Sequence, residues 1–540
     1  MIQNKIFSSV GRYIFPVVIF IILSISGSGQ NNKQDLSGVR KYNSLMQMIK
    51  FAYVDSVNES KLVEKAIVET LKELDPHSMY ISKKDLQRAN EELVGNFEGI
   101  GVQFEILRDT INIVHPIPGG PSERLGILSG DKIIKIESEN VTGKKITNQF
   151  VFDRLRGKKG TKVNISIYRS GKKDLIDFTI IRDKIPINSI DASYIIQPGI
   201  GYIILTRFSS TSMKEFTDAM AKLKEEGMKS LILDLRNNGG GYMNTAIDLA
   251  DQFLEAKRLI VYTQGRMSPR EDYYSTGKGM FEKVKLVIMI NENSASASEI
   301  VSGAIQDLDR GIIVGRRSFG KGLVQRPFQL PDSSEVRLTT ARYYTPSGRC
   351  IQKSYSEGVD KYYEDFTTRL KHGEMENSDS IKFPDSLKFH TSKGRIVYGG
   401  GGIMPDVFIP LDTTPFTDYF LNLRRKNVIN LFVGDYVDKY RKDLKTKYPD
   451  FDTFDRKFIL DDEFMKDFLA LAEKQGVKMN EKEYGLSEIL IKSQIKSLIV
   501  QKLWDVNDSY KIINQEDNEV QKAIGIINND ALFNKMGIQR

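Results

Sequence analysis

Residues 285–307 read KLVIMINENSASASEIVSGAIQD, and the spacing of their apolar residues changes from that of a strand to that of a helix. The first part, LVIMI, is a continuous apolar run of the kind that forms a buried strand. Helical spacing follows, because Ile300, Val301 and Ala304 fall on one face of a helix. A buried strand that leads into a helix predicts an α/β layer, with three serines at the turn between the two elements.

The same alternation is present on the N-terminal side of this stretch. Apolar strand patterns at 201–208 (GYIILTRF) and 231–236 (LILDLR) are followed by helical patterns at 212–226 and 243–254. Strands that alternate with helices indicate an α/β core.

Changes of pattern along the chain predict a multidomain α/β protein. The chain has 540 residues, which is too long for a single core. The apolar period is helical at first, then two residues in a series of short strands, and the chain is strongly helical and charged at the end. We predict five segments: residues 1–29, a signal peptide or anchor; residues 37–95, helical; residues 96–184, a β-rich domain; residues 185–412, the α/β core with a polar, irregular insertion at about 354–393; and residues 413–540, a helical extension.

Composition excludes several classes of protein. With 40% hydrophobic and 27% charged residues, the chain has the composition of an ordinary folded protein. The net charge is +8, but no basic tract is interleaved with aromatic residues, so we expect no nucleic-acid partner. The sequence has no H-E-x-x-H motif and no cluster of cysteine and histidine, so we expect no metal and no cofactor. A single cysteine, Cys350, rules out an intrachain disulfide.

The first 30 residues follow the basic, apolar, small-residue order of a secretory signal. Lys5 and Arg12 are followed by an apolar run at 13–25 and by small residues at 26–29. The run is shorter than the roughly 20 residues that a membrane-spanning helix needs. We therefore expect an exported protein of the periplasm or cell envelope. Cleavage of this segment and its retention as a membrane anchor both stay open.

The serines at the strand-to-helix turn have two interpretations. Ser296 and Glu299 match the capping box S-x-x-E, in which a hydroxyl and a carboxylate bind the free amides of the first helical turn. The same turn suits a nucleophile, because helix-start amides and the positive end of the helix dipole stabilise an oxyanion. A run of three serines can contain both a cap and a nucleophile.

A nucleophilic serine needs a base, and lysine is better placed than histidine to be one. All four histidines lie outside residues 199–344, so a Ser-His-Asp triad would need an imidazole from another domain. In GRRSFGKGLVQ, Lys321 can act if burial keeps it neutral, and Gln325 would face the same side of an extended segment. A surface lysine in a glycine turn is the other interpretation. The stretch nearly matches a phosphate loop, but Gly322 stands where that loop needs serine or threonine.

A third element is LILDLRNNGGGYM at 231–243, in which a strand ends in three consecutive glycines. Such a turn either presents backbone amides as an anion-binding nest or acts as a flexible connector. If the glycine, serine and lysine turns lie at neighbouring strand ends, they meet at one edge of the sheet, where α/β sites form.

Together these stretches resemble the carboxy-terminal processing peptidases, also called tail-specific proteases, over about residues 39–410. The matching motifs are LDPHSMY (74–80), EGIGVQF (98–104), PSERLGILSGDKIIKIE (121–137), LDLRNNGGG (233–241), SASASEIVSGAIQD (294–307), GRRSFGKGLVQ (315–325), YYTPSGRCIQ (343–352) and GGIMPDV (401–407).

The resemblance implies a serine endopeptidase with its site residues on these motifs. Ser296 would be the nucleophile, Lys321 the general base and Gln325 the residue that orients the lysine. The oxyanion would be held by the amide of Ala297 and by an amide of the glycine turn, for which we favour Gly240. The family often has proline one residue before this glycine, where the chain has another glycine, and this change leaves the amides of the turn available.

The resemblance also implies that residues 96–184 are a PDZ domain that binds the C-terminal tails of protein substrates. Its carboxylate-binding turn would be formed by Gly99, Ile100, Gly101 and Val102. The tail would then add beside the following strand. The apolar residues of the helical stretch at 148–155 either face the tail or belong to the core.

The sequence thus predicts an exported serine endopeptidase that selects proteins by their C-terminal tails and uses a Ser-Lys dyad supported by glutamine. One alternative is a non-catalytic peptide- or ligand-binding protein on the same scaffold, and another is a PDZ scaffold that recruits partners. The helices after residue 416 lie outside the resemblance. They would pack on the protease, on a second subunit or on an adaptor.

Overall fold

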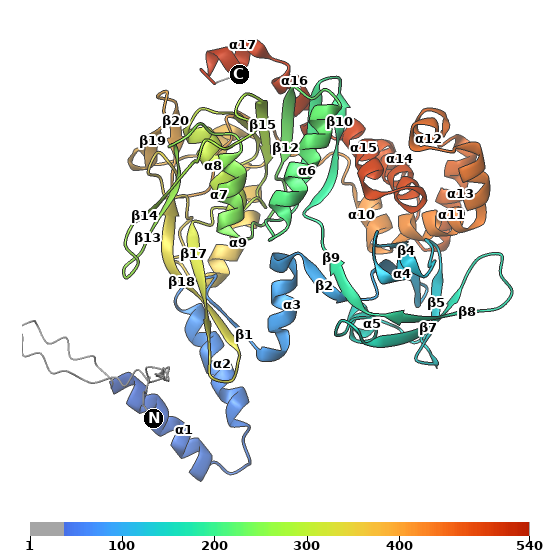
Figure 1. The fold of residues 1–540 in the computed structure, drawn as a ribbon, viewed down its shortest axis with the longest axis horizontal. Coiled ribbons are helices and arrows are strands. Elements are labelled where there is room, and N and C mark those ends of the chain that lie inside the picture. The colour runs from blue at the N-terminus through green and yellow to red at the C-terminus, as the bar shows by residue number, and fades with distance from the viewer. Residues whose placement is uncertain (1–36, 539–540) are drawn as a thin grey trace, which may run out of the picture. The chain divides into compact units, whose positions relative to one another are not determined.

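The computed structural model describes residues 37–538 (Figure 1). The described residues fall into two units, divided between Ala66 and Ile67. The first contains α1 (Ser37–Ala52), which has no buried residue, and the start of α2 (Glu59–Lys72). The predicted signal or anchor segment lies outside the described residues. Between residues 37 and 538, every helix is too short or too polar to span a bilayer.

The core of the second unit is a six-stranded sheet in the order β10-β11-β12-β15-β16-β21. The strands from β11 to β21 pair in parallel, and β10 pairs antiparallel with β11. The predicted α/β layer is therefore confirmed. The strands are β10 (Ile190–Gln197), β11 (Ile200–Leu205), β12 (Ser230–Asp234), β15 (Lys285–Ile290), β16 (Ile312–Gly315) and β21 (Val407–Phe408).

Helices cover both faces of this sheet, because its strands are apolar on both sides. Leu231 and Leu233 belong to the core on one face, and Ile232 and Val287 belong to the core on the other. Parallel strands buried in this way appear in the sequence as continuous apolar runs. The first face is covered by α6 (Ser212–Glu225), α7 (Met243–Asp251) and α8 (Ala297–Asp307), and the second by α16 (Asn518–Ile527) and α17 (Asp530–Lys535).

A second, antiparallel sheet carries the hairpin that follows the lysine turn. In it, β17 pairs with β18, and β18 also pairs with β1 and β13. Pairing with β1 brings the segment just after residue 74 against the core. The strands are β1 (Met79–Ile81), β13 (Leu259–Gln264), β14 (Glu271–Tyr274), β17 (Leu323–Gln329) and β18 (Glu335–Tyr344).

The polar segment at 354–393 is more regular than its sequence indicates. It contains α9 (Val359–Lys371), and β19 (Lys388–His390) pairs with β20 (Ile396–Tyr398) just beyond it. The helix is stable because Tyr362 and Arg369, two turns apart, are buried on one face. A search for helical spacing of apolar residues does not detect a helix that buries an arginine.

The β-rich domain is an antiparallel sheet in the order β3-β4-β5-β7-β8, with β6 beside β5. Its helix α5 buries Val151 and Leu155 in the domain core, so these two residues are core residues. Strand β3 lies at the edge of the sheet. Helix α3 (Lys83–Val94) precedes the domain, and β2 pairs with β9 in a separate two-stranded sheet. The elements of the domain are β2 (Asn96–Gly99), β3 (Val102–Leu107), β4 (Thr110–Pro116), α4 (Pro121–Arg124), β5 (Lys132–Ile136), β6 (Glu139–Asn140), α5 (Asn148–Leu155), β7 (Lys162–Tyr168), β8 (Ile176–Ile181) and β9 (Asp183–Pro186).

The C-terminal extension is helical, as predicted, and has an aromatic core of its own. Trp504 packs against this core, with its ring 5.1 Å from that of Phe454. The extension contacts the β-rich domain of the same chain through the ion pair of Arg108 with Asp435, at 2.6 Å. Its helices before α16 are α10 (Asp418–Arg425), α11 (Val428–Lys447), α12 (Phe451–Lys457), α13 (Asp462–Lys474), α14 (Glu481–Leu503) and α15 (Val506–Glu516).

Candidate active site

Ser296 lies at the turn between β15 and α8 in a backbone conformation that is unusual for serine. Its φ is 56° and its ψ is −110°, and residues other than glycine rarely adopt a positive φ. The predicted capping box is formed, and the Ser296 N–H donates to Glu299 Oε2 at 2.8 Å. The Tyr343 hydroxyl donates to the Ser296 carbonyl at 3.1 Å. Ser296 also lines a cavity, so one residue both caps the helix and faces open space.

The buried carboxylate of Glu299 joins the serine turn to the lysine turn. Its Oε1 accepts hydrogen bonds from Ser318 Oγ at 2.5 Å and from the Gly320 N–H at 2.7 Å. Its Oε2 accepts from the Lys321 N–H at 2.9 Å, in addition to the Ser296 N–H. Burial raises the pKa of Glu299, and these four donors oppose the rise. Glu299 therefore fixes how far apart the two turns lie.

The Lys321 amine is held by Gln325 in surroundings that make it less basic. Lys321 Nζ donates to Gln325 Oε1 at 3.2 Å. Desolvation by burial lowers the pKa of Lys321, although the Glu299 and Asp75 carboxylates act in the opposite direction. A lysine that serves as a general base near neutral pH needs a shift in this direction.

The motif LDPHSMY completes the surroundings of the lysine, a role that the sequence did not assign. Gln325 Nε2 donates to the His77 carbonyl. Asp75 Oδ1 fixes this turn by accepting from the N–H groups of His77 and Ser78, both at 2.8 Å. The His77 ring contacts the Tyr362 hydroxyl at 2.8 Å, and burial, followed by the charge of Lys321, lowers the pKa of His77 to about 4. His77 is therefore neutral at pH 7 and reaches the site through its main chain.

Ser296, Lys321 and Gln325 line one cavity of about 410 Å³. Among the described residues, the Lys321 amine is hydrogen bonded to Gln325 and not to Ser296. No group of three or more His, Cys, Asp or Glu side chains between residues 37 and 538 is placed to hold a metal ion. Much of the remaining wall is apolar and includes Leu93, Met243, Ile300, Leu323, Val324 and Tyr343.

The glycine turn lies against the serine turn, and the amide of Gly240, the predicted oxyanion donor, is hydrogen bonded within the turn. The Gly240 N–H donates to Asn238 Oδ1 at 2.9 Å, so it is not free to bind an oxyanion in this arrangement. Gly239 and Gly241 line the cavity instead. The Ala297 N–H has no hydrogen-bond acceptor within the described part of the chain. The arrangement therefore offers Ala297 and a cavity-lining glycine as oxyanion donors.

The predicted carboxylate-binding turn connects β2 to β3. Gly99 ends β2, Val102 begins β3, and Gly101 has a φ of 74°. The Ile100 carbonyl accepts from Ser122 Oγ at 2.6 Å, which ties the turn to α4. Because β3 is an edge strand, an extended peptide has a strand to pair with directly after this turn.

Three family models match parts of the chain. A model of peptidase family S41 matches residues 199–364, which include Ser296, Lys321 and Gln325. A PDZ domain model matches residues 99–180. A model described as a family of unknown function, DUF8443, matches residues 419–505 in the helical extension.

Relatives match over most of the same region. The carboxy-terminal-processing protease of Bartonella bacilliformis is 34% identical over 357 residues, which are 65% of this chain and 81% of the relative. The carboxy-terminal processing protease CtpA of Bacillus subtilis is 36% identical over 314 residues, which are 58% of this chain and 66% of the relative. The solved structure of a photosystem II D1 C-terminal processing protease is 28% identical, with a TM-score of 0.33, and the match covers 57% of this chain and 83% of that one. The chain therefore belongs to peptidase family S41, as a carboxy-terminal-processing serine protease with a PDZ domain.

Proposed function

We propose that this peptidase cuts its substrates with Ser296 as the nucleophile, Lys321 as the general base and Gln325 as the residue that orients the lysine. The observation that carries the proposal is their convergence on one cavity from two separate turns, where burial also lowers the pKa of Lys321. A neutral amine that donates one hydrogen to Gln325 keeps its lone pair for the serine hydroxyl.

The reaction follows from these groups. Lys321 takes the proton of the Ser296 hydroxyl, and Oγ attacks the carbonyl carbon of the peptide bond. The oxyanion accepts hydrogen bonds from the Ala297 N–H and from an amide of the glycine turn. The intermediate collapses as Lys321 gives its proton to the departing amine. Water, activated by the same lysine, then cleaves the Ser296 ester. No step uses a metal or an organic cofactor.

The PDZ domain would select the substrate by its C-terminal tail. The terminal carboxylate would lie at the turn of residues 99–102, and the tail would extend along β3, the edge strand of the sheet. The apolar wall of the cavity would take the side chain next to the cleaved bond. We also propose export to the periplasm or cell envelope, on the strength of the basic, apolar, small-residue order of residues 1–29.

Variants of the neighbouring serines test the catalytic assignment. We expect Ser296→Ala and Lys321→Ala to abolish cleavage of an unfolded protein substrate, with binding of a tail peptide unchanged. Ser294→Ala and Ser298→Ala serve as matched controls, because these hydroxyls bind the main-chain carbonyls of Leu235 and Asn238 and do not line the cavity. The controls should keep measurable cleavage. Turnover by Ser296→Ala at the level of the controls would refute the assignment.

Removal of the last few residues of the substrate tests the tail-recognition step separately. We expect KM to rise and kcat to change little, since the tail binds away from the cleaved bond. Equal KM values for the full and the shortened substrate would contradict recognition by the PDZ domain and leave the Ser296 assignment intact.

A further inference from the structure

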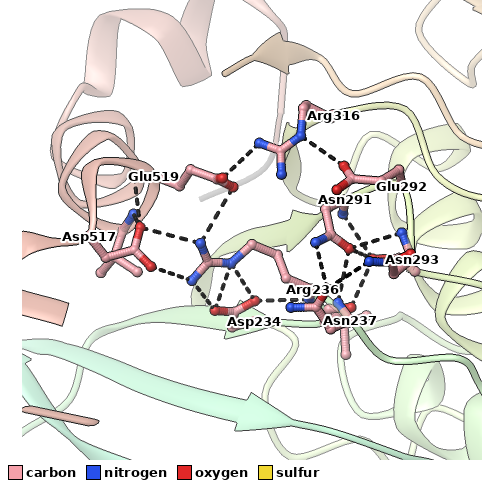
Figure 2. A network of polar contacts seen from close by, with 12 residues as sticks. Asp234, Arg236, Asn237, Asn291, Glu292, Asn293, Arg316, Asp517 and Glu519 are labelled. Atoms are coloured by element: carbon pink, nitrogen blue, oxygen red, sulfur yellow. Dashed lines mark hydrogen bonds and ion pairs between the residues drawn. The ribbon is translucent and has the colours of Figure 1, made fainter. Parts of the chain in front are cut away.

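Two acidic residues of the C-terminal segment contact the arginines from which two catalytic turns begin. Arg236 follows β12 and leads into the glycine turn, and Arg316 follows β16 and leads into the lysine turn. Asp517 is the N-cap residue of α16, and Glu519 lies in the first turn of this helix. The helix lies outside the regions matched by the S41 and DUF8443 models. Figure 2 shows both acids beside the two arginines.

Arg236 is shared by three carboxylates. Its guanidinium lies 2.7 Å from Asp234, 3.0 Å from Asp517 and 3.4 Å from Glu519. The Arg236 side chain is 13% exposed, so these contacts are formed largely out of water. Hydrogen bonds between charged groups in such surroundings are directional and strong.

Glu519 also reaches the second arginine. Arg316 Nη1 lies 2.7 Å from Glu519 Oε1, and Arg316 Nε lies 2.8 Å from Glu292 Oε2. The Arg316 side chain is 3% exposed. Glu292 belongs to the serine turn. One carboxylate of α16 therefore connects the beginnings of the glycine turn and the lysine turn, and through Arg316 it also reaches the serine turn.

Asn237, the residue after Arg236, connects the glycine turn to the serine turn through hydrogen bonds. The Asn237 N–H donates to Asn291 Oδ1 at 2.9 Å. Asn237 Oδ1 in turn accepts from Asn291 Nδ2 and Asn293 Nδ2, both at 3.0 Å. Asn237 has a φ of 59°, which packing and hydrogen bonds have to maintain. Figure 2 shows the three asparagines next to Arg236.

Arg236 and Arg316 do not need Asp517 and Glu519 to neutralise their charges. Asp234 already pairs with Arg236, and Glu292 already pairs with Arg316. Asp517 and Glu519 add two more carboxylates to two guanidiniums that have partners. What they add is a connection between segments: α16 covers one face of the core sheet, and its acids fix the position of the strand-end arginines.

We infer that Asp517 and Glu519 are positioning residues of the peptidase reaction, an inference that rests on the proposed role of Ser296. They hold Arg236 and Arg316 so that the glycine turn keeps its amides against the serine turn. The C-terminal segment is therefore part of the catalytic unit, although neither acid lines the cavity.

The test compares Asp517→Asn with Glu519→Gln, singly and together, against Asp530→Asn. Asp530 is a matched control, because it belongs to the same segment and binds Lys285 at 2.7 Å, at the strand end away from the serine turn. We expect the double variant to lose about 10- to 100-fold in kcat at unchanged KM, since a displacement of about 1 Å costs about 100-fold in rate. Asp530→Asn should keep the wild-type kcat.

Amide hydrogen exchange in the Ser296→Ala background provides a readout that needs no activity. Exchange at residues 236–241 and 291–297 should accelerate in the double variant and stay unchanged in Asp530→Asn. Equality of the double variant and the control in both readouts, or faster exchange spread evenly over the core, would overturn the inference. If the double variant does not fold, each single variant is judged by the same two readouts. If the wild-type protein cleaves no substrate, the proposed function is refuted. The hydrogen-exchange data then still test whether Asp517 and Glu519 position the two turns.

Discussion

Replacement of Gly240 by alanine should remove most of the cleavage activity while the chain stays folded. Gly240 has a φ of 102°, and its backbone lies directly against the serine turn. A Cβ at this position would lie 2.8 Å from Ser296 Cβ, 2.9 Å from the Ala295 carbonyl oxygen and 3.0 Å from the Ala297 nitrogen. Two of these three atoms belong to the backbone, so no rotation of a side chain relieves the whole overlap.

The size of the effect follows from these distances. A residue other than glycine at positive φ costs about 1–2 kcal/mol. Carbon atoms in ordinary contact are at least about 3.5 Å apart, so Ser296 Cβ and the new methyl group have to separate by about 0.7 Å. A displacement of about 1 Å at a reacting group lowers the rate about 100-fold. We therefore expect Gly240→Ala to lower kcat by roughly 100-fold and the free energy of unfolding by about 2 kcal/mol.

Gly239→Ala is the control for this experiment. No heavy atom lies within 4 Å of a Cβ built at Gly239, and its φ is outside the left-handed region. This variant should keep kcat within about threefold of the wild type. The measurements are kcat on one unfolded protein substrate and urea-induced unfolding. Equal losses of kcat in the two variants, or more than about a tenth of the wild-type kcat in Gly240→Ala, would refute the link between catalysis and the packing of the glycine turn on Ser296.

The remaining predictions concern Lys321, the contact between His77 and Gln325, and the contact of the helical extension with the β-rich domain. Lys321→Met should abolish cleavage and yet raise the free energy of unfolding at pH 7. Because the pKa of Lys321 is lowered in the folded state, protonation of the buried amine lowers the free energy of unfolding as the pH falls below the ordinary pKa of 10.5, and methionine has no amine to protonate. A variant that is less stable than the wild type in urea titrations would contradict the burial of the amine. In the wild type, kcat/KM should rise with pH through the same lowered pKa. His77→Asn should keep at least about a third of kcat, because the main-chain carbonyl and not the ring holds Gln325, whereas Gln325→Leu should lose about tenfold or more. Arg108→Ala should change the free energy of unfolding by less than about 1 kcal/mol, since its ion pair with Asp435 is exposed.

The core and the position of its turns are predictable from the sequence for a simple physical reason. Strands buried on both faces are continuous apolar runs, so 201–208, 231–236 and 285–290 are recognisable without any structure. In a parallel sheet their carboxyl ends lie at one edge. The convergence of the glycine, serine and lysine turns follows from that geometry, and the structure confirms that they meet.

The hydrogen bonds that organise these turns are less predictable, because they join residues far apart in the chain. Glu299 is recognisable as the end of a capping box, but three of its four donors lie 19 to 22 residues later. In the described arrangement the N–H of Gly240, the predicted oxyanion donor, donates instead to the side chain of Asn238, two residues before it. The spacing of residues in the sequence predicts neither the donors of Glu299 nor the acceptor of the Gly240 N–H.

The same limit applies to contacts that close long loops. Gln325 depends on the His77 carbonyl, 248 residues earlier, and Arg236 depends on Asp517, 281 residues later. The motif LDPHSMY contains His77, but the sequence does not predict that its carbonyl binds Gln325. Nothing in the pattern of α16 marks the second, since Asp517 and Glu519 resemble the ordinary acidic start of a helix.

These long-range contacts also determine when the site becomes active. Burial is the largest influence that lowers the pKa of Lys321, and the surrounding groups come from the turn at Asp75, from Glu299 and from the β17–β18 hairpin. Before these segments meet, the lysine has its ordinary pKa of 10.5 and is protonated near neutral pH. A protonated amine cannot take the proton of Ser296. Under the proposed mechanism, Ser296 therefore has no base in a chain that is not yet folded, and we expect peptidase activity to appear together with the packing that also positions the glycine turn.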